Sequence, residues 1–245
     1  MTDHNDKPFV LGFSNLDEKN PFAVQVREYL QHEVAKHPNV QLVIRDNDLN
    51  TAKAVANVRE FAQYPVDMAI VFHIDERAGS DLVIPLMLKR IPTICIDIPL
   101  ADAIFLGIDA YRAGTYAGNA LAEWININWH GRIDKVLVLV EQRTLDVMLS
   151  RFTYALTAIA ESVMYDRNSV LYLDNGGGDE SCIDRVRRVL EVWEDEHHIA
   201  VLAMNDKVAA AALTAVRAMN REQDIAMLSF DGTPVALQEF RNPES

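Results

Sequence analysis

The stretch VLAMNDKVAAAALTAV, residues 201–216, changes from one kind of pattern to another within a few positions. Its first four residues are apolar in succession, which is typical of a strand covered on both faces of a parallel sheet. The alanine-rich part that follows Asn205 and Asp206 has the pattern of a helix. The stretch therefore predicts a strand that runs directly into a helix, with an amide and a carboxylate at the junction.

The same change of pattern recurs along the whole chain. Short runs rich in Val, Ile and Leu alternate with longer segments of helical period. The predicted strands are residues 9–14, 40–45, 67–72, 92–97, 135–140, 169–174, 199–204 and 225–230. This alternation predicts an α/β protein with parallel sheets and right-handed crossovers.

One stretch, residues 97–114, breaks this rhythm. Two extended segments follow each other around Pro99, with no helical period between them, so we expect the chain to cross there from one lobe to another. The turn at 231–234 is a candidate for the return crossing. The predicted division is a first lobe of residues 1–101, to which 236–245 return, and a second lobe of residues 102–235.

Composition excludes several classes of function. The 245 residues carry a net charge of −13 and no Lys/Arg-rich run, so the chain lacks the clustered positive charge that nucleic acid binding needs. No apolar run is long enough to span a membrane. The first ten residues lack the basic and apolar regions of a secretory signal. We therefore expect a periplasmic location if a leader has been removed and a cytoplasmic one otherwise.

Polar residues gather where the predicted strands end. In parallel α/β sheets, ligands bind beyond the carboxyl ends of the strands. Asp and Asn are also favoured helix N-caps, and this competing explanation fits Asp206 and Asp109, which directly precede helical patterns. Asn205 is one position earlier, at the strand end, so we assign it to a ligand. Asp97 precedes Pro99 and an extended segment, so it has no helix to cap and is also assigned to a ligand.

No catalytic motif is present in the sequence. There is no G-x-S-x-G, H-E-x-x-H or G-x-G-x-x-G pattern, and NGGGDES, residues 175–181, lacks the Lys-Ser/Thr pair of a phosphate loop. His73 has no second His or Cys nearby in the sequence that would indicate a metal. Cys95 and Cys182 show no metal-binding spacing, and nothing supports a disulfide between them. We expect a protein that is not an enzyme and has no cofactor and no metal site.

Several of these junctions resemble a known family, the type I periplasmic sugar-binding proteins. The first is LGFSNLDEKNPFAVQVREYL, residues 11–30, in which a strand ending in Ser/Asn is followed by Asn-Pro-Phe at a helix start. The later landmarks, in the family's order and spacing, are VDMAIVFHID (66–75), IPTICIDIP (91–99), GIDAYRAGTYAGNALAEW (107–124), VLAMNDKVAAAALTAV (201–216) and LSFDGTPVALQEF (228–240). The resemblance covers nearly all of the chain.

The resemblance implies two Rossmann-like α/β lobes, joined by a strand hinge, that close on a small polar ligand. Carried over position by position, the implied ligand contacts of the first lobe are Ser14, Asn15, Asn20, Phe22, Phe72 or His73, and Asp97. Those of the second lobe and hinge are Asn205, Phe230 and Asp231. Carboxylates and amides suit pairs of sugar hydroxyls, and aromatic faces suit the C–H surface of a sugar.

The chain departs from the family pattern at two positions where an arginine is common. Ile98 follows the fourth-strand Asp, and Leu149 stands in the helix after the fifth strand, although Arg143 and Arg151 are close by. Members of the family also run further at the carboxyl end, so the resemblance implies a chain that lacks its last crossing.

The resemblance leaves three roles open. The first is the substrate-binding component of an ABC importer, with a sugar-like ligand and an ABC permease as partners. The second is the effector-binding domain of a LacI-type transcription regulator, and the third is the sensor domain of a signalling receptor.

Overall fold

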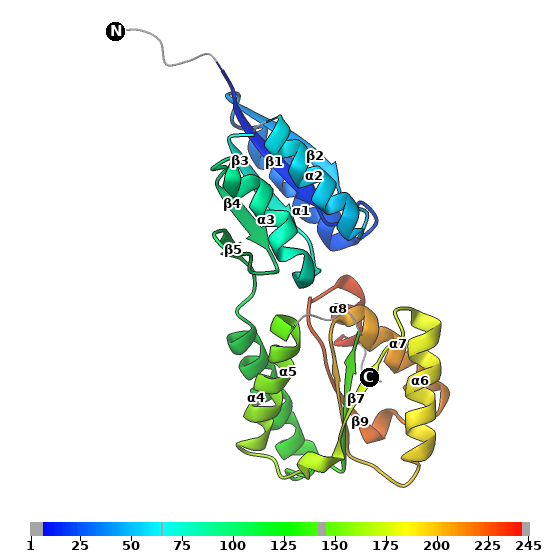
Figure 1. Ribbon diagram of the computed structural model, residues 1–245. Helices are drawn as coiled ribbons and strands as arrows, with labels where there is room; N and C mark the ends of the chain where they lie inside the picture. Colours follow the sequence, from blue (N-terminus) through cyan, green and yellow to red (C-terminus); the bar gives the residue numbers. More distant parts are fainter. Residues whose placement is uncertain (1–6, 65, 142–145, 242–245) are drawn as a thin grey trace. The chain divides into compact units, whose positions relative to one another are not determined.

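The computed structural model describes residues 7–64, 66–141 and 146–241, and it divides the chain into two compact units, Met1–Ile108 and Asp109–Ser245. Each unit is a parallel sheet with helices packed against it (Figure 1). The α/β class predicted from the sequence is confirmed. No helix in the described ranges is long and apolar enough to cross a membrane.

The first unit contains a five-stranded parallel sheet in the order β2-β1-β3-β4-β5. Its elements are β1 (Phe9–Asn15), α1 (Pro21–Val34), β2 (Val40–Asp46), α2 (Thr51–Gln63), β3 (Met68–Phe72), a 3₁₀ turn (Glu76–Ala78), α3 (Gly79–Leu88), β4 (Thr93–Ile96) and β5 (Ile104–Leu106). Helices α1 and α2 each begin at an Asn N-cap, Asn20 and Asn50, whose side-chain oxygen accepts backbone N–H groups of the first turn.

The second unit contains a four-stranded parallel sheet in the order β7-β6-β8-β9. Its elements are α4 (Ala110–Asn128), β6 (Lys135–Val140), α5 (Asp146–Ala160), a 3₁₀ turn (Arg167–Ser169), β7 (Val170–Asp174), α6 (Asp179–Val192), β8 (Ile199–Ala203), α7 (Asp206–Ala218), a second 3₁₀ turn (Glu222–Asp224), β9 (Ile225–Leu228) and α8 (Pro234–Glu239).

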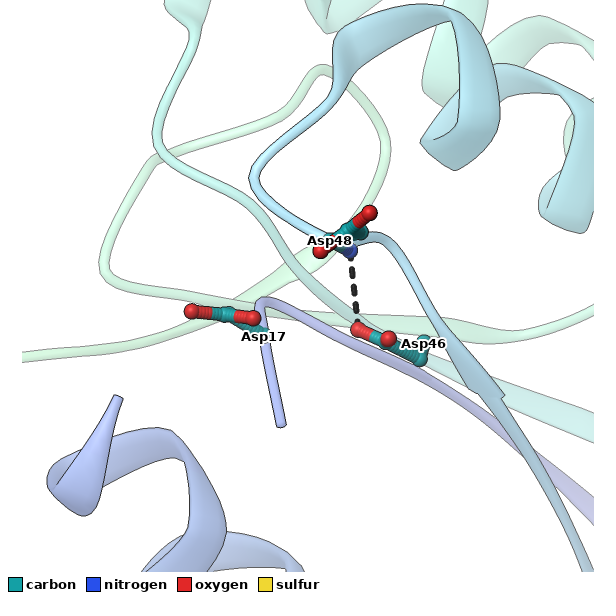
Figure 2. A group of neighbouring side chains, drawn as sticks. All are labelled: Asp17, Asp46 and Asp48. Carbon is teal, nitrogen blue, oxygen red and sulfur yellow. Dashed lines mark hydrogen bonds between the residues drawn. The ribbon is translucent and has the colours of Figure 1, made fainter. Parts of the chain in front are cut away.

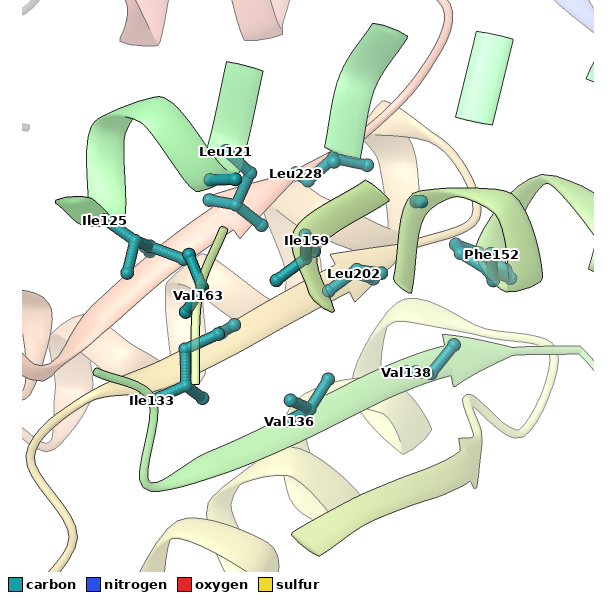
Figure 3. Packing of buried hydrophobic residues seen from close by; sticks show 14 of the residues in the cluster. Leu121, Ile125, Ile133, Val136, Val138, Phe152, Ile159, Val163, Leu202 and Leu228 are labelled. Atoms are coloured by element: carbon teal, nitrogen blue, oxygen red, sulfur yellow. The ribbon is translucent and has the colours of Figure 1, made fainter. Parts of the chain in front are cut away.

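The core of the second unit explains why its strands are apolar at every position. All five residues of β8 are buried, because helices cover both faces of the sheet. Figure 3 shows one of the two faces, where Phe152 and Ile159 of α5 pack with Leu121 and Ile125 of α4 over Val136 and Val138 of β6.

Helices α4 and α5 approach each other closely through two glycines. A Cβ atom at Gly114 would lie 2.2 Å from the carbonyl oxygen of Arg151, and one at Gly118 would lie 2.4 Å from that of Ala155. Only glycine allows this approach without displacing the backbone. The contact fixes the position of α5 against α4 and therefore the position of Arg151.

The eight predicted strands are all present, within two residues of the predicted bounds. A ninth strand, β5, lies where we expected the chain to cross between lobes. It pairs with β4, with Ile94 opposite Ile104, and therefore belongs to the first sheet. The division consequently falls after Ile108, whereas the predicted boundary was at residues 101 and 102.

The described part of the predicted return segment, residues 236–241, packs within the second unit. Arg217 of α7 donates to both carboxylate oxygens of Glu239 in α8, at 3.1 and 2.7 Å. Residues 242–245 of the predicted return lie outside the described ranges.

Candidate functional site

The carboxyl edge of the first sheet carries a network of buried amides. Ser14 Oγ donates to Asn47 Oδ1 at 2.7 Å, and Asn57 Nδ2 donates to the same oxygen at 2.8 Å. Asn47 Nδ2 in turn donates to the carbonyl oxygen of Phe72 at 3.0 Å. These bonds join the ends of β1, β2 and β3 through α2, so the edge is held as one rigid frame.

Asn15 is the last residue of β1 and is fully buried. Its Nδ2 donates to the carbonyl of Asp17 at 3.3 Å and to Glu18 Oε1 at 2.9 Å. Its Oδ1 is also buried, and no hydrogen-bond donor for it lies within the described part of the chain. The carboxamide is therefore fixed by its nitrogen and keeps an unused acceptor.

His73 directly follows β3 and is 1 % exposed. Thr51 Oγ1 donates its only proton to Asp75 Oδ2 at 2.9 Å, so it accepts from His73 Nε2, which lies 3.2 Å away. This geometry assigns the neutral ring with its proton on Nε2. The Nδ1 atom is then an acceptor, and among the described residues it has no hydrogen-bond partner.

The charges around His73 agree with a neutral ring. Burial lowers the pKa of His73 and outweighs the opposite effect of the Asp75 carboxylate. Burial raises the pKa of Asp75, but hydrogen bonds from Arg77 and Thr51 outweigh it and hold the pKa below its ordinary value. At neutral pH the site thus combines an uncharged imidazole with an ionised carboxylate.

The start of α1 places one aromatic side chain at the surface. Asn20 caps the helix, because its Oδ1 accepts the backbone N–H groups of Phe22 at 2.9 Å and Ala23 at 3.3 Å. Phe22 is 54 % exposed and meets the buried Phe72 edge to face, with ring centroids 5.9 Å apart. Of these two rings, Phe22 is therefore the one that can contact a ligand, and the buried Phe72 packs against it.

Asp97 lies directly after β4 and is half-buried. Its φ of 67° is in the left-handed region, which Asp tolerates better than most residues. Its backbone N–H donates to the carbonyl of Leu106 at 3.1 Å. As expected from Pro99, no helix begins at this residue.

The second unit places its polar residues differently from our prediction. Asn205, assigned above to a ligand, is the N-cap of α7, and its Oδ1 accepts the Val208 N–H at 2.9 Å. Asp206, predicted to be the cap, is the first helical residue and is buried. Its carboxylate accepts from Ser229 Oγ at 2.5 Å and from the Thr233 N–H at 2.6 Å. The cap prediction was therefore one residue too late, and Asp206 instead holds the loop after β9. The cap predicted at Asp109 is confirmed by its bond from the Arg112 N–H at 3.0 Å.

Phe230 and Asp231 follow β9. The guanidinium carbon of the buried Arg151 lies 4.8 Å from the centroid of the Phe230 ring, a cation–π arrangement. Asp231 is exposed and has a φ of 105°. Arg143, the other arginine considered above, lies outside the described residues.

Sequence reasoning missed three residues of the first edge, Asn47, Thr51 and Asn57. Asn47 follows β2 directly, but the predicted strand ended one residue too early, at residue 45, so the rule that selected Ser14 and His73 did not reach it. Thr51 and Asn57 lie on α2, and no pattern in the sequence indicates that their side chains turn toward the strand ends.

The fold defines the class of protein. Two parallel α/β units, one after the other, form the architecture of type I periplasmic binding proteins. A family model described as a periplasmic binding protein domain matches residues 11–244, and the chain belongs to that family.

Individual relatives agree with this assignment. The ribose import binding protein RbsB of Bacillus subtilis (strain 168) is 23 % identical over 241 residues, which cover 97 % of this chain and 74 % of that protein. An ABC sugar transporter subunit from Rhodobacter sphaeroides 2.4.1 superposes with a TM-score of 0.80 at 17 % identity, over 96 % of this chain and 82 % of the other. The Caulobacter myo-inositol binding protein, bound to myo-inositol, gives a TM-score of 0.76 at 22 % identity, over 97 % and 79 % of the two chains.

Proposed function

We propose that this chain binds a sugar or a sugar-like polyol, without chemical turnover, as the periplasmic substrate-binding component of an ABC importer. The relatives named above include a ribose import protein, an ABC sugar transporter subunit and a myo-inositol binding protein. The names of these relatives indicate the class of ligand. The side chains at the carboxyl edges of the two sheets are of the types that would bind such a ligand.

The observation that carries the proposal is the pair of unused acceptors at the first edge. Asn15 Oδ1 and His73 Nδ1 are buried without a donor among the described residues. Leaving a buried polar atom unpaired costs about 1–3 kcal/mol. A ligand hydroxyl that donates to such an atom would recover that cost. The exposed ring of Phe22 offers a face for the C–H surface of the same ligand.

Five further predicted residues would contact the ligand, and the contacts described above indicate which atoms some of them can offer. Asn20 and Asn205 use Oδ1 to cap helices, so each would offer a ligand its Nδ2 donors. Asp97 and Asp231 would accept from hydroxyl groups. Phe230, with Arg151 against its ring, would provide the aromatic surface of the second unit.

The test is a thermal-shift titration of the chain against aldoses, ketoses, sugar alcohols, nucleosides and amino acids. A ligand at one hundred times its Kd stabilises the folded state by about 2.7 kcal/mol, which raises the melting temperature by several degrees. A saturable shift with one class of sugar or polyol is expected. A shift with amino acids or nucleosides alone would overturn the assigned ligand class.

Two matched variants then locate the site. Asp97→Asn should weaken binding of the identified ligand by at least about tenfold, since it removes a charged acceptor from a strand end. Asp102→Asn is the control, because Asp102 also has a positive φ, 56°, but is exposed in the turn before β5. Equal affinities for both variants would show that the ligand does not contact Asp97.

A further inference from the structure

Three carboxylates meet at the carboxyl edge of the first sheet. Asp17 lies in the loop after β1, Asp46 ends β2, and Asp48 lies in the loop after β2 (Figure 2). One carboxylate oxygen of each lies within 4.8 Å of those of the other two. Like charges this close repel one another, so the arrangement favours a cation between them.

The buried member of this group has one oxygen atom with no donor among the described residues. Asp17 is 4 % exposed, and its Oδ1 has no hydrogen-bond partner within the described ranges. A buried carboxylate oxygen without a donor is costly in a folded protein, and a bound metal ion would satisfy it.

The nearby lysines do not satisfy Asp17. Lys19 Nζ lies 2.8 Å from Asp48 Oδ1 and Lys53 Nζ lies 3.5 Å from Asp46 Oδ2, and both lysine side chains are substantially exposed. Exposed pairs of this kind contribute little free energy. Within the described ranges, neither lysine forms an ion pair with the buried Asp17, so a small divalent ion can compete with them.

We propose that Asp17, Asp46 and Asp48 form a calcium site. All the available ligand atoms are oxygens, which suits a hard cation, and Ca²⁺ accepts the irregular geometry of side chains from a strand end and two loops. Mg²⁺ demands a near-ideal octahedral geometry and is therefore the less suited of the two ions. The ion would tie the loop before α1 to the loop before α2. The spacing of His and Cys in the sequence led us to expect no metal, whereas this site consists of carboxylates.

The test is isothermal titration of the EDTA-treated full chain with CaCl₂, in the absence of sugar, so that its outcome does not depend on the proposed function. Saturable binding of one ion per chain is expected, with a Kd of about 10⁻⁴ M or below. Asp17→Asn should raise the Kd at least about tenfold, because it removes the buried charge without changing the shape of the side chain. Asp81→Asn, at an exposed position of α3, is the control for the loss of one negative charge.

Two further variants extend the titration. Lys19→Met should lower the Kd for Ca²⁺, since it removes the competing ammonium group from Asp48. If circular dichroism shows that Asp17→Asn fails to fold, Asp48→Asn at its more exposed position replaces it. The proposal is overturned if the parent chain shows no saturable binding of Ca²⁺, or if the aspartate variant tested at position 17 or 48 binds Ca²⁺ as tightly as the parent does. It is also overturned if Asp81→Asn loses as much affinity for Ca²⁺ as that variant. Equally tight binding of Mg²⁺ would overturn the choice of calcium.

Discussion

The two sheets of this protein end in polar residues of the same types, but their side chains do different work. At the first edge, Asn15 and His73 are buried and each keeps an acceptor that no described residue satisfies. At the second edge, Asn205 caps α7 and Asp206 accepts two hydrogen bonds from the loop after β9. At the first edge two buried acceptors therefore remain without a donor among the described residues. At the second edge the oxygens of Asn205 and Asp206 accept hydrogen bonds from the protein itself.

The difference shows that position at a strand end does not by itself indicate a ligand contact. A polar residue there either completes the protein's own hydrogen bonds or remains available to another molecule. Variants at these residues test the comparison. Loss of an internal hydrogen bond should lower the stability of the fold, whereas loss of a ligand contact should lower the affinity for the ligand.

The largest effect is expected from Asn47→Ala. The substitution leaves the hydroxyl of Ser14, an N–H of Asn57 and the carbonyl of Phe72 without their partner in a buried place, so it should lower the free energy of unfolding by about 3–4 kcal/mol. Urea denaturation followed by circular dichroism measures this loss. Asn50→Ala is the control, since it removes only a helix cap and should cost about 1 kcal/mol. Equal losses would mean that the buried network contributes little.

Asp206→Ala should lower the free energy of unfolding by about 2–3 kcal/mol, because the Ser229 hydroxyl and the Thr233 N–H lose a charged acceptor. The comparison variant is Asp109→Ala, which removes a cap and should cost about 1 kcal/mol. The same denaturation experiment serves both variants. A loss at Asp206 no greater than that at Asp109 would contradict the view that the second edge is fixed by this carboxylate.

The fold was largely predictable from the sequence because its signals are local. Each buried parallel strand is a run of apolar residues, and each helix has its own period, so all eight predicted strands are present. The short strand β5 was missed as part of the first sheet. Its three residues are all exposed, so their pattern does not reveal the pairing with β4.

The site was less predictable because side-chain partners depend on contacts between distant residues. The sequence places Asn205 and Asp206 at a strand end but does not show which of them begins the helix, and the order was wrong by one residue. The ten residues predicted to contact a ligand remain a prediction. Their hydrogen-bond partners could not be predicted, since Asn47 and Ser14 are 33 positions apart.

Asn205→Asp separates capping from ligand binding at the second edge. An aspartate retains the oxygen that accepts the Val208 N–H, so the free energy of unfolding should change by less than about 0.5 kcal/mol. It removes the Nδ2 donors, so affinity for the sugar identified in the thermal-shift panel should fall about tenfold, which corresponds to about 1.4 kcal/mol. Titration calorimetry measures the affinity. Unchanged affinity would restrict Asn205 to its role as a cap.

The smallest effect is a change of stability with pH that arises at the first edge. Burial holds the pKa of His73 in the folded protein below that of a histidine in the unfolded chain, which is about 6.5. As the pH falls through that value, the unfolded chain takes up a proton that the folded ring does not, and the free energy of unfolding decreases. His73→Gln removes this contribution, so the difference in stability between pH 7.5 and pH 5.5 should be smaller in the variant than in the parent.

Denaturation of both proteins at the two pH values provides the measurement. His37→Gln is the control, because His37 is exposed and its variant should retain the pH dependence of the parent. An identical pH dependence in the parent and His73→Gln would mean that the ring takes up its proton at the same pH in the folded and the unfolded chain. Burial would then not keep the ring neutral, and below that pH the first edge would lose one of the two acceptors that distinguish it from the second.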